Sequence, residues 1–361
     1  MDTLAPRDRL AQIALARAAV MRDGRAAPPR GWAEGAWIER SWRRCLEIGH
    51  APEHRVAFDL VPEQALKRLH EAHHVVLAAA RPVLDGLSRA LASTGYFAIL
   101  TNEHGIVVDV HGPIDRNDRR ARLITRVGVD LSERAVGTTA IGAALAELQP
   151  VWLHRGEHFF DDTACYSCAG APVFAPDGSC AGMLDLTGID AVERSELKHL
   201  AAQAARSIEN ALALALPHRL LLRLNWPGRA IGGDDDALLV LDDDGWVLGS
   251  NAVARDLVPA LQPPGSRPHC SEFIAQPWQP LFDEAARAQP RTMELLLTSG
   301  LCVTVVASTG DHRATVSPLR DVEIALIRNA VAQARGNVAA AAKKLGISRA
   351  TVYRKLGSRP H

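Results

Sequence analysis

Apolar residues follow a helical period of three and four positions along the first ninety residues of the chain. This spacing predicts helices over residues 7–22, 37–49 and 62–93. Pro82 is expected to kink or split the last of these, because proline lacks the amide hydrogen that a helix interior uses. The pattern then changes to short apolar runs between turn residues. It predicts strands at 96–100, 106–110, 151–154, 171–174 and 180–186, closed by a helix over 192–216.

A second strand–turn–strand pattern begins at residue 238. The expected strands are 238–241, 246–248, 292–297 and 301–306, with a short helix starting at Asn251. The last segment predicts helices over 321–334, 338–345 and 349–356. The fold class is therefore α+β, with two units of antiparallel strands and helices, and an all-α segment at the C-terminus.

Length and composition place the chain among ordinary globular proteins. Its 361 residues suit two or three domains, and equal numbers of basic and acidic residues (41 each) exclude a uniformly basic coat or a long acidic tail. The sequence has no run of eighteen apolar residues and no apolar signal core near its start, so we expect a cytoplasmic protein without a membrane partner. Six cysteines are too few for a disulfide framework.

Charge is concentrated at the C-terminal end. Residues 318–361 contain nine Lys and Arg but only two Asp and Glu, which leaves a net charge of +7 on this segment. A compact basic segment on an acidic body is the electrostatic footprint of a protein that binds phosphates. Double-stranded DNA is therefore the expected partner.

Cap and turn residues in the same segment predict a helix-turn-helix. Asn337 is placed to cap one helix, Gly346 to make the turn and Ser348 to cap a second helix that fits the major groove. Arg349 and Thr351 are best placed for base edges, where a bidentate Arg349 contact to guanine contributes ~1–3 kcal/mol of specificity. Phosphate contacts are expected from Asn337, Tyr353, Arg354 and Lys355. A solvated basic hairpin is the alternative.

The string GNVAAAAKKLGISRATVYRKL closely resembles the Fis-type helix-turn-helix of bacterial regulators. The resemblance implies that the preceding helix, residues 321–334, helps to form a homodimer. A dimer would bind a two-fold operator with half-sites about one helical turn, ~34 Å, apart.

The middle of the chain resembles the GAF domain of regulators of the acetoin and glycerol type. The similarity lies in VGVDLSERAVGTTAIGAALAELQPVWLHRGEHF and CAGAPVFAPDGSCAGMLDLTG, and ERSWRRCLEIG resembles the SW-x-RC element that precedes this domain. The resemblance implies a sensor for a small-molecule effector, by family a small alcohol, ketone or diol. The candidate ligand-binding residues are Tyr96, Thr138, Trp152, His154, Phe159, Phe160, Cys168 and Asp185. The small residues Gly137, Thr138, Thr139 and Gly142 suit either close ligand approach or plain helix–sheet packing.

Cysteine spacing offers an alternative chemistry. Cys165 and Cys168 form a C-x-x-C with His154, His158, Asp161 and Asp162 upstream, which suits zinc, iron or a redox disulfide. A GAF-fold thiol enzyme acting through Cys165, Cys168 and Cys180 is the corresponding rival function. A lone C-x-x-C is a weak metal signal because structural zinc sites use a second pair of ligands. The sequence names no cofactor.

The stretch ALLVLDDDGWVLGSN resembles the opening of a PAS domain. We therefore expect an N-terminal helical segment (1–61), a GAF-like sensor domain (62–217), a PAS-like domain (218–317) and the Fis-type segment (318–361). A nucleoid-type DNA binder without sequence preference is a third interpretation, and it leaves two sensor-like domains without a role.

Regulators with this domain order usually carry an AAA+ ATPase before the helix-turn-helix. Only about fourteen residues separate the last predicted strand from the first C-terminal helix, and the chain contains no G-x-x-x-x-G-K-[ST] phosphate loop. We expect a ligand-responsive regulator that is not an enzyme. It would act by repression, by recruiting RNA polymerase, or by assisting a full-length relative.

Overall fold

The computed structural model describes residues 6–23, 35–287, 289–310, 331, 337–345 and 352. The chain divides into two units, Met1–Gly310 and Asp311–His361. The first unit contains two antiparallel sheets with helices, which confirms the α+β class. Among the described helices, none is both long and apolar enough to cross a membrane.

The first sheet has five strands in the order β2-β1-β5-β4-β3, all antiparallel. Their bounds are β1 Tyr96–Thr101, β2 Val107–His111, β3 Val151–His154, β4 Tyr166–Phe174 and β5 Cys180–Ile189. All five were predicted, but β4 begins five residues earlier than expected. Its first half, Tyr166–Gly170, is rich in small residues whose weak β propensity hides the strand, and pairing with β3 and β5 extends it.

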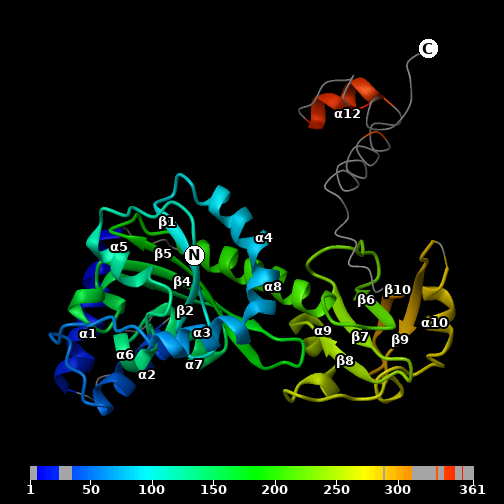
Figure 1. Ribbon diagram of the computed structural model, residues 1–361, viewed down its shortest axis with the longest axis horizontal. Coiled ribbons are helices and arrows are strands. Elements are labelled where there is room, and N and C mark those ends of the chain that lie inside the picture. The colour runs from blue at the N-terminus through cyan, green and yellow to red at the C-terminus, as the bar shows by residue number, and fades with distance from the viewer. Residues whose placement is uncertain are drawn as a thin grey trace. The chain divides into compact units, whose positions relative to one another are not determined.

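Helices cover both faces of this sheet. One face packs against α4 (His74–Ala90) and α8 (Leu197–Leu214), which lie side by side in Figure 1. The other face packs against α7 (Ala140–Glu147), and the same apolar cluster includes α1 (Pro6–Asp23) and α2 (Gly35–Glu47). The N-terminal helices are therefore part of the core of the first sheet.

The helix predicted over residues 62–93 is two helices, but it does not split at Pro82, which lies inside the second of them. Helix α3 (Glu63–Ala72) ends at His73, where φ is −101° and ψ is 9°, and α4 then runs through Pro82. The His73 ring explains the break, because Nδ1 lies 2.9 Å from the Leu69 carbonyl and Nε2 lies 2.9 Å from a Glu103 carboxylate oxygen. Packing of α4 on the sheet offsets the hydrogen bond lost at Pro82.

Short helices connect the strands around the α7 face. They are α5 (Arg119–Ile124), α6 (Glu133–Val136) and the 3₁₀ turns Arg155–Glu157 and Asp161–Thr163. These elements are too short to show a periodic apolar stripe, so the sequence pattern did not predict them.

The second sheet has the order β8-β7-β6-β10-β9 and is also antiparallel. Its strands are β6 Leu220–Asn225, β7 Ala237–Leu241, β8 Val247–Ser250, β9 Thr292–Leu296 and β10 Cys302–Ser308. The sequence pattern missed β6, which is the central strand. In both sheets the first strand along the chain pairs with the last: β1 with β5, and β6 with β10.

Helices α9 (Ala252–Leu257) and α10 (Pro280–Ala285) pack on one face of the second sheet, beside 3₁₀ turns at Pro259–Leu261 and Cys270–Glu272. The C-terminal end of α8 reaches the other face through Ala213. The Asn251 side chain links α9 to α8. Its Oδ1 caps α9 by accepting from the Ala254 amide at 2.9 Å, and its Nδ2 donates to Asn210 Oδ1 of α8 at 2.8 Å. Helix α8 therefore contacts both sheets.

Candidate functional site

A small cavity of about 30 Å³ lies on the α7 face of the first sheet. Apolar side chains from the sheet and the short helices form most of its wall: Phe58, Ile99, Ile124, Leu131, Val136, Ala140 and Ile141. Polar groups complete the lining: Thr139, His158, Thr163, Tyr166, Cys168, Asp185 and Thr187. An apolar pocket with a few convergent polar groups is the usual form of a small-molecule site.

The floor of the cavity is polar because β4 and β5 place three side chains together. Thr187 pairs directly with Cys168 across the strands, and its Oγ1 lies 3.4 Å from the Cys168 sulfur. The Thr187 hydroxyl also donates to Asp185 Oδ2. Asp185 is 1% exposed and its Oδ1 has no hydrogen-bond partner among the described residues. Burial raises the pKa of this carboxyl to about 7, so both its protonated and ionised forms occur near neutral pH.

His158 adds a second unpartnered polar atom to the cavity wall. Its Nδ1 lies 2.9 Å from the carbonyl oxygen of Arg155, which assigns the ring proton to Nδ1 and leaves Nε2 as an acceptor. Nε2 is buried and has no partner among the described residues. Burial lowers the pKa of His158 to about 4, so the ring is neutral at pH 7.

The sheet divides the predicted ligand residues between its two faces. Cys168 and Asp185 line the cavity. The opposite face carries Tyr96, Trp152 and His154. Tyr96 and Trp152 belong to the apolar cluster with α4 and α8. His154 lies two positions after Trp152 in β3 and therefore points to the same side of the sheet. There the Tyr96 hydroxyl donates to the Val192 carbonyl at 2.9 Å, and His154 Nδ1 lies 2.8 Å from Ser167 Oγ.

The three remaining predicted residues border the cavity without lining it. Phe159 and Phe160 are buried and meet edge to face, with ring centroids 5.1 Å apart, beside Gly137. The Thr138 hydroxyl lies 2.7 Å from that of Ser41 in α2. Sequence reasoning missed Thr187 and His158. Strand alternation was a usable signal for Thr187, which lies two positions after Asp185. The sequence singled out His158 only as a possible metal ligand beside the C-x-x-C, and no local pattern places it at a ligand cavity.

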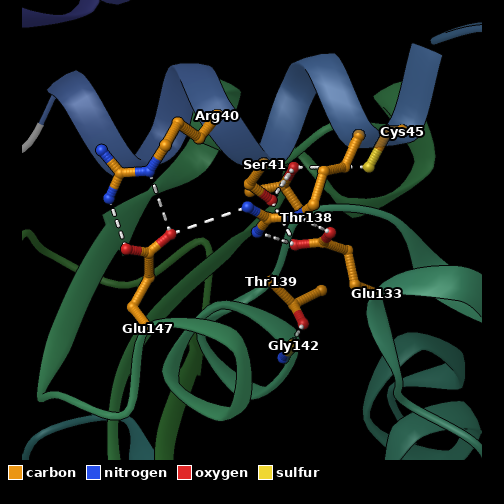
Figure 2. Close-up of polar contacts among 9 residues, drawn as sticks. Arg40, Ser41, Cys45, Glu133, Thr138, Thr139, Gly142 and Glu147 are labelled. Atoms are coloured by element: carbon orange, nitrogen blue, oxygen red, sulfur yellow. Dashed lines mark hydrogen bonds and ion pairs between the residues drawn. The ribbon is translucent and has the colours of Figure 1, made fainter. Parts of the chain in front are cut away.

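Helix α2 is clamped onto the α6–α7 segment by the SW-x-RC element. Arg44 donates to both oxygens of Glu133, through Nε at 2.6 Å and Nη2 at 2.8 Å, and Ser41 Oγ donates to Glu133 at 2.5 Å. Figure 2 shows Ser41 and Cys45 of α2 facing Thr138, with Glu133 beside them. From the same helix, Trp42 Nε1 donates to the Glu157 carbonyl at 2.9 Å. The motif therefore holds the segment whose residues Thr139, Ala140 and Ile141 wall the cavity.

Close packing accounts for Gly142 and its capping threonine. A Cβ at position 142 would lie 2.7 Å from Glu133 Cβ and 2.8 Å from the Glu133 amide nitrogen. Thr139 caps α7, since its hydroxyl accepts from the Gly142 amide at 3.2 Å (Figure 2). Of the two interpretations of these small residues, the geometry at Gly142 supports helix packing.

The six cysteines are all free. Cys165 is half-buried just before β4, and Cys168 lies within that strand. Burial raises the pKa of the Cys165, Cys168 and Cys180 thiols, which lowers their thiolate fraction and hence their reactivity. Within the described ranges there is no group of three or more His, Cys, Asp or Glu side chains that could hold a metal ion.

In the second unit, the structure describes the first of the two expected DNA-binding helices. Helix α12 spans Val338–Leu345, as the sequence predicts, and Asn337 caps it by accepting from the Ala340 amide at 3.1 Å. Ala342 and Val352 are buried against each other. The predicted DNA contacts Ser348, Arg349, Thr351, Tyr353, Arg354 and Lys355 lie outside the described residues.

Several characterised regulators are similar to this chain. The acetoin catabolism regulatory protein of Cupriavidus necator is 29% identical over 257 residues, which are 70% of this chain and 38% of that protein. AcoR, the acetoin dehydrogenase operon transcriptional activator of Bacillus subtilis, is 28% identical over 49% of this chain and 29% of its own length. MimR, the propane 2-monooxygenase operon transcriptional activator of Mycolicibacterium goodii, is 28% identical over 55% of this chain and 35% of its own length. The chain thus spans about a third of the length of these relatives.

Among solved structures, the crystal structure of the Escherichia coli DhaR(N)–DhaL complex aligns with 75% of this chain and 99% of its own chain, with a TM-score of 0.45 and 14% identity. Two family profiles match the sequence directly. Residues 318–357 match the Fis family of bacterial regulatory proteins, and residues 15–210, more than half of the chain, match the MimR N-terminal domain. The chain therefore belongs to the MimR N-terminal domain family of transcription regulators and carries a Fis-family helix-turn-helix segment.

Proposed function

We propose that this protein is a ligand-responsive transcription regulator, in which the cavity of a GAF-like domain holds a small-molecule effector. The Fis-type segment would bind double-stranded DNA as a homodimer. The observation that carries the sensing role is the pair of buried, unpartnered polar atoms, Asp185 Oδ1 and His158 Nε2, in an otherwise mainly apolar cavity. Buried polar atoms without partners are costly, and a ligand that pairs with them removes that cost.

The cavity lining supports a small alcohol, ketone or diol as the effector. His158 Nε2 accepts a hydrogen bond from a hydroxyl group, and Asp185 either accepts from a hydroxyl or, when protonated, donates to a carbonyl. The apolar wall suits a short hydrocarbon body. Two of the relatives are named for acetoin catabolism or the acetoin dehydrogenase operon, and acetoin carries both a hydroxyl and a carbonyl.

The size of the cavity suggests how binding would be signalled. A volume of about 30 Å³ holds only one or two water molecules, so an effector has to expand the cavity. Expansion would press on Ala140 and Ile141 of α7, and hence on the segment that Glu133 ties to α2. An effector that binds the expanded arrangement better shifts the population toward it.

The remaining parts of the proposal concern output. The second sheet would be a PAS-like domain that contributes to dimer formation or to signal transfer through α8. Because the chain contains no phosphate loop, it would act without ATP hydrolysis, by recruiting RNA polymerase, by repression, or together with a full-length relative. Burial raises the pKa of the Cys165 and Cys168 thiols, and the resulting low thiolate fraction argues against a redox function for this pair.

A titration of the protein against its own promoter and against random DNA tests the DNA-binding role. At physiological salt we expect promoter affinity to exceed random-DNA affinity by at least ~10³-fold. Arg349→Ala should lose ~1–3 kcal/mol on the promoter only, as a base contact does. Equal binding to both DNAs that disappears with added salt would exclude specific recognition, because phosphate contacts alone behave in this way.

Acetoin is the first probe for the cavity, with thermal unfolding of the full chain as the measurement. At a concentration of ~100 times its Kd, a ligand that binds only the native state stabilises it by ~2.7 kcal/mol and raises the melting temperature. His158→Leu removes the free acceptor and should abolish this shift. His154→Leu is the matched control, since His154 is also a buried histidine whose pKa is lowered to about 4, but lies on the opposite face. Full shifts in both variants would place the ligand elsewhere.

A further inference from the structure

An arginine-rich groove lies outside the cavity, beside the edge strand β2 and helix α5. Its volume is about 580 Å³. Four arginines surround it: Arg116, Arg119, Arg122 and Arg126. Val110, Ile114 and Leu123 supply an apolar surface within the same groove.

The positive charge of this groove is not neutralised locally. None of the described residues that line it carries a carboxylate. Arg126 donates to two backbone carbonyls, of Leu123 through Nε at 3.1 Å and of Phe58 through Nη2 at 2.5 Å. Arg116, Arg119 and Arg122 are exposed, and their guanidinium groups make no hydrogen bond or ion pair with the described part of the chain.

The neighbouring Arg120, by contrast, is ion-paired with carboxylates, as arginines in folded proteins often are. Its guanidinium lies 2.8 Å from Asp118 and 2.6 Å from Asp190, so it is paired twice. Aspartates are therefore present next to the groove, but they pair with the arginine that does not line it. Several like charges in a concave site repel one another and focus a positive potential that attracts anions.

We propose that this groove binds a compact anion carrying two or more phosphate or carboxylate groups. Guanidinium groups match both kinds of oxyanion through bidentate hydrogen bonds. The volume falls within the ~300–1,000 Å³ range of small-molecule sites, and the apolar surface suits the carbon skeleton of an organic anion.

The groove is distinct from the effector cavity, although the two are neighbours. They share no lining residue, but Ile124 of α5 lines the cavity while Arg122 and Leu123 line the groove. Arg126 also holds the carbonyl of Phe58, whose side chain lines the cavity. The anion site thus stands independently of the proposed effector and of DNA binding by the C-terminal segment.

Calorimetric titration of the full chain with pyrophosphate and with citrate tests this site, in a phosphate-free buffer at low salt. We expect at least one of the two to bind, and neutral sorbitol not to bind. The double variant Arg119→Ala/Arg122→Ala should weaken anion binding at least ~10-fold, since each charged hydrogen bond contributes measurably. Arg81→Ala, which removes an exposed arginine of α4 outside the groove, is the matched control and should bind as the parent does.

Preference for pyrophosphate or for citrate identifies the anion class. The proposal is overturned if neither probe binds, or if the double variant and Arg81→Ala lose affinity equally, as a general charge effect would cause. It is also overturned if the double variant changes only the affinity for random DNA, which would make the groove a phosphate-backbone contact. Because the substituted side chains are exposed, all variants should keep the parent melting temperature; Arg116→Ala provides a second test if the double variant does not.

Discussion

The Asp185→Asn variant is expected to be more stable than the parent protein above pH 7, by on the order of 4 kcal/mol at pH 8. The carboxyl has a pKa of about 7 in the folded chain, against 3.8 when solvated. Between these values the unfolded state loses its proton while the folded state keeps it. The stability that the parent gains from a protonated Asp185 is therefore fully present below pH 3.8. It is lost as the pH rises, and the loss is complete once the pH passes 7. Asparagine stays neutral and retains an oxygen that accepts from Thr187.

Urea unfolding of both proteins at pH 5 and pH 8 measures this effect. The stability gap should be more than twice as large at pH 8 as at pH 5. Contributions from His154 and His158 largely cancel, because both proteins contain them. Asp59→Asn, which changes an exposed carboxyl, is the control and should show almost no gap. A constant gap across the pH range would mean that Asp185 is already ionised in the folded chain near pH 5.

The Gly142→Ala variant is expected to unfold ~1–3 kcal/mol more easily than the parent, the usual cost of overpacking. The added Cβ would lie 2.8 Å from the amide nitrogen of Glu133, and this backbone atom cannot move aside as a flexible side chain does. The clash would separate α6 from α7 and disturb the Arg44 and Ser41 contacts to Glu133. Loss of effector binding should accompany the loss of stability.

Gly86→Ala supplies the matched control in helix α4. The nearest atom to an added Cβ there is Arg89 Nη2 at 4.0 Å, so alanine makes only an ordinary van der Waals contact with the end of a flexible side chain. This variant should gain up to ~1 kcal/mol, because alanine loses less backbone entropy than glycine in a helix. Chemical denaturation of the two variants side by side is the measurement. A stabilised Gly142→Ala variant would show that α6 and α7 do not approach this closely.

The sequence by itself determined the strands, the helix starts and the family, because each of these depends on residues that are close together along the chain. Short apolar runs between turn residues predicted all five strands of the first sheet and four of the five strands of the second. Two cap residues predicted where helices begin: Asn251 predicted the start of α9, and Asn337 predicted the start of α12. The motif strings pointed to a family that the comparisons then confirmed over residues 15–210 and 318–357.

Tertiary structure alone decided how these segments combine. Alternation along a strand shows that Trp152 and Cys168 are buried, but not that they face opposite sides of the sheet, because facing depends on pairing with distant strands. The central strand β6 begins soon after the end of α8, in the same apolar stretch of the sequence, and only its pairing with β7 and β10 distinguishes it. His158 and Glu133 acquire their roles from partners far along the chain, since a cavity and a clamp are non-local arrangements that no local pattern encodes.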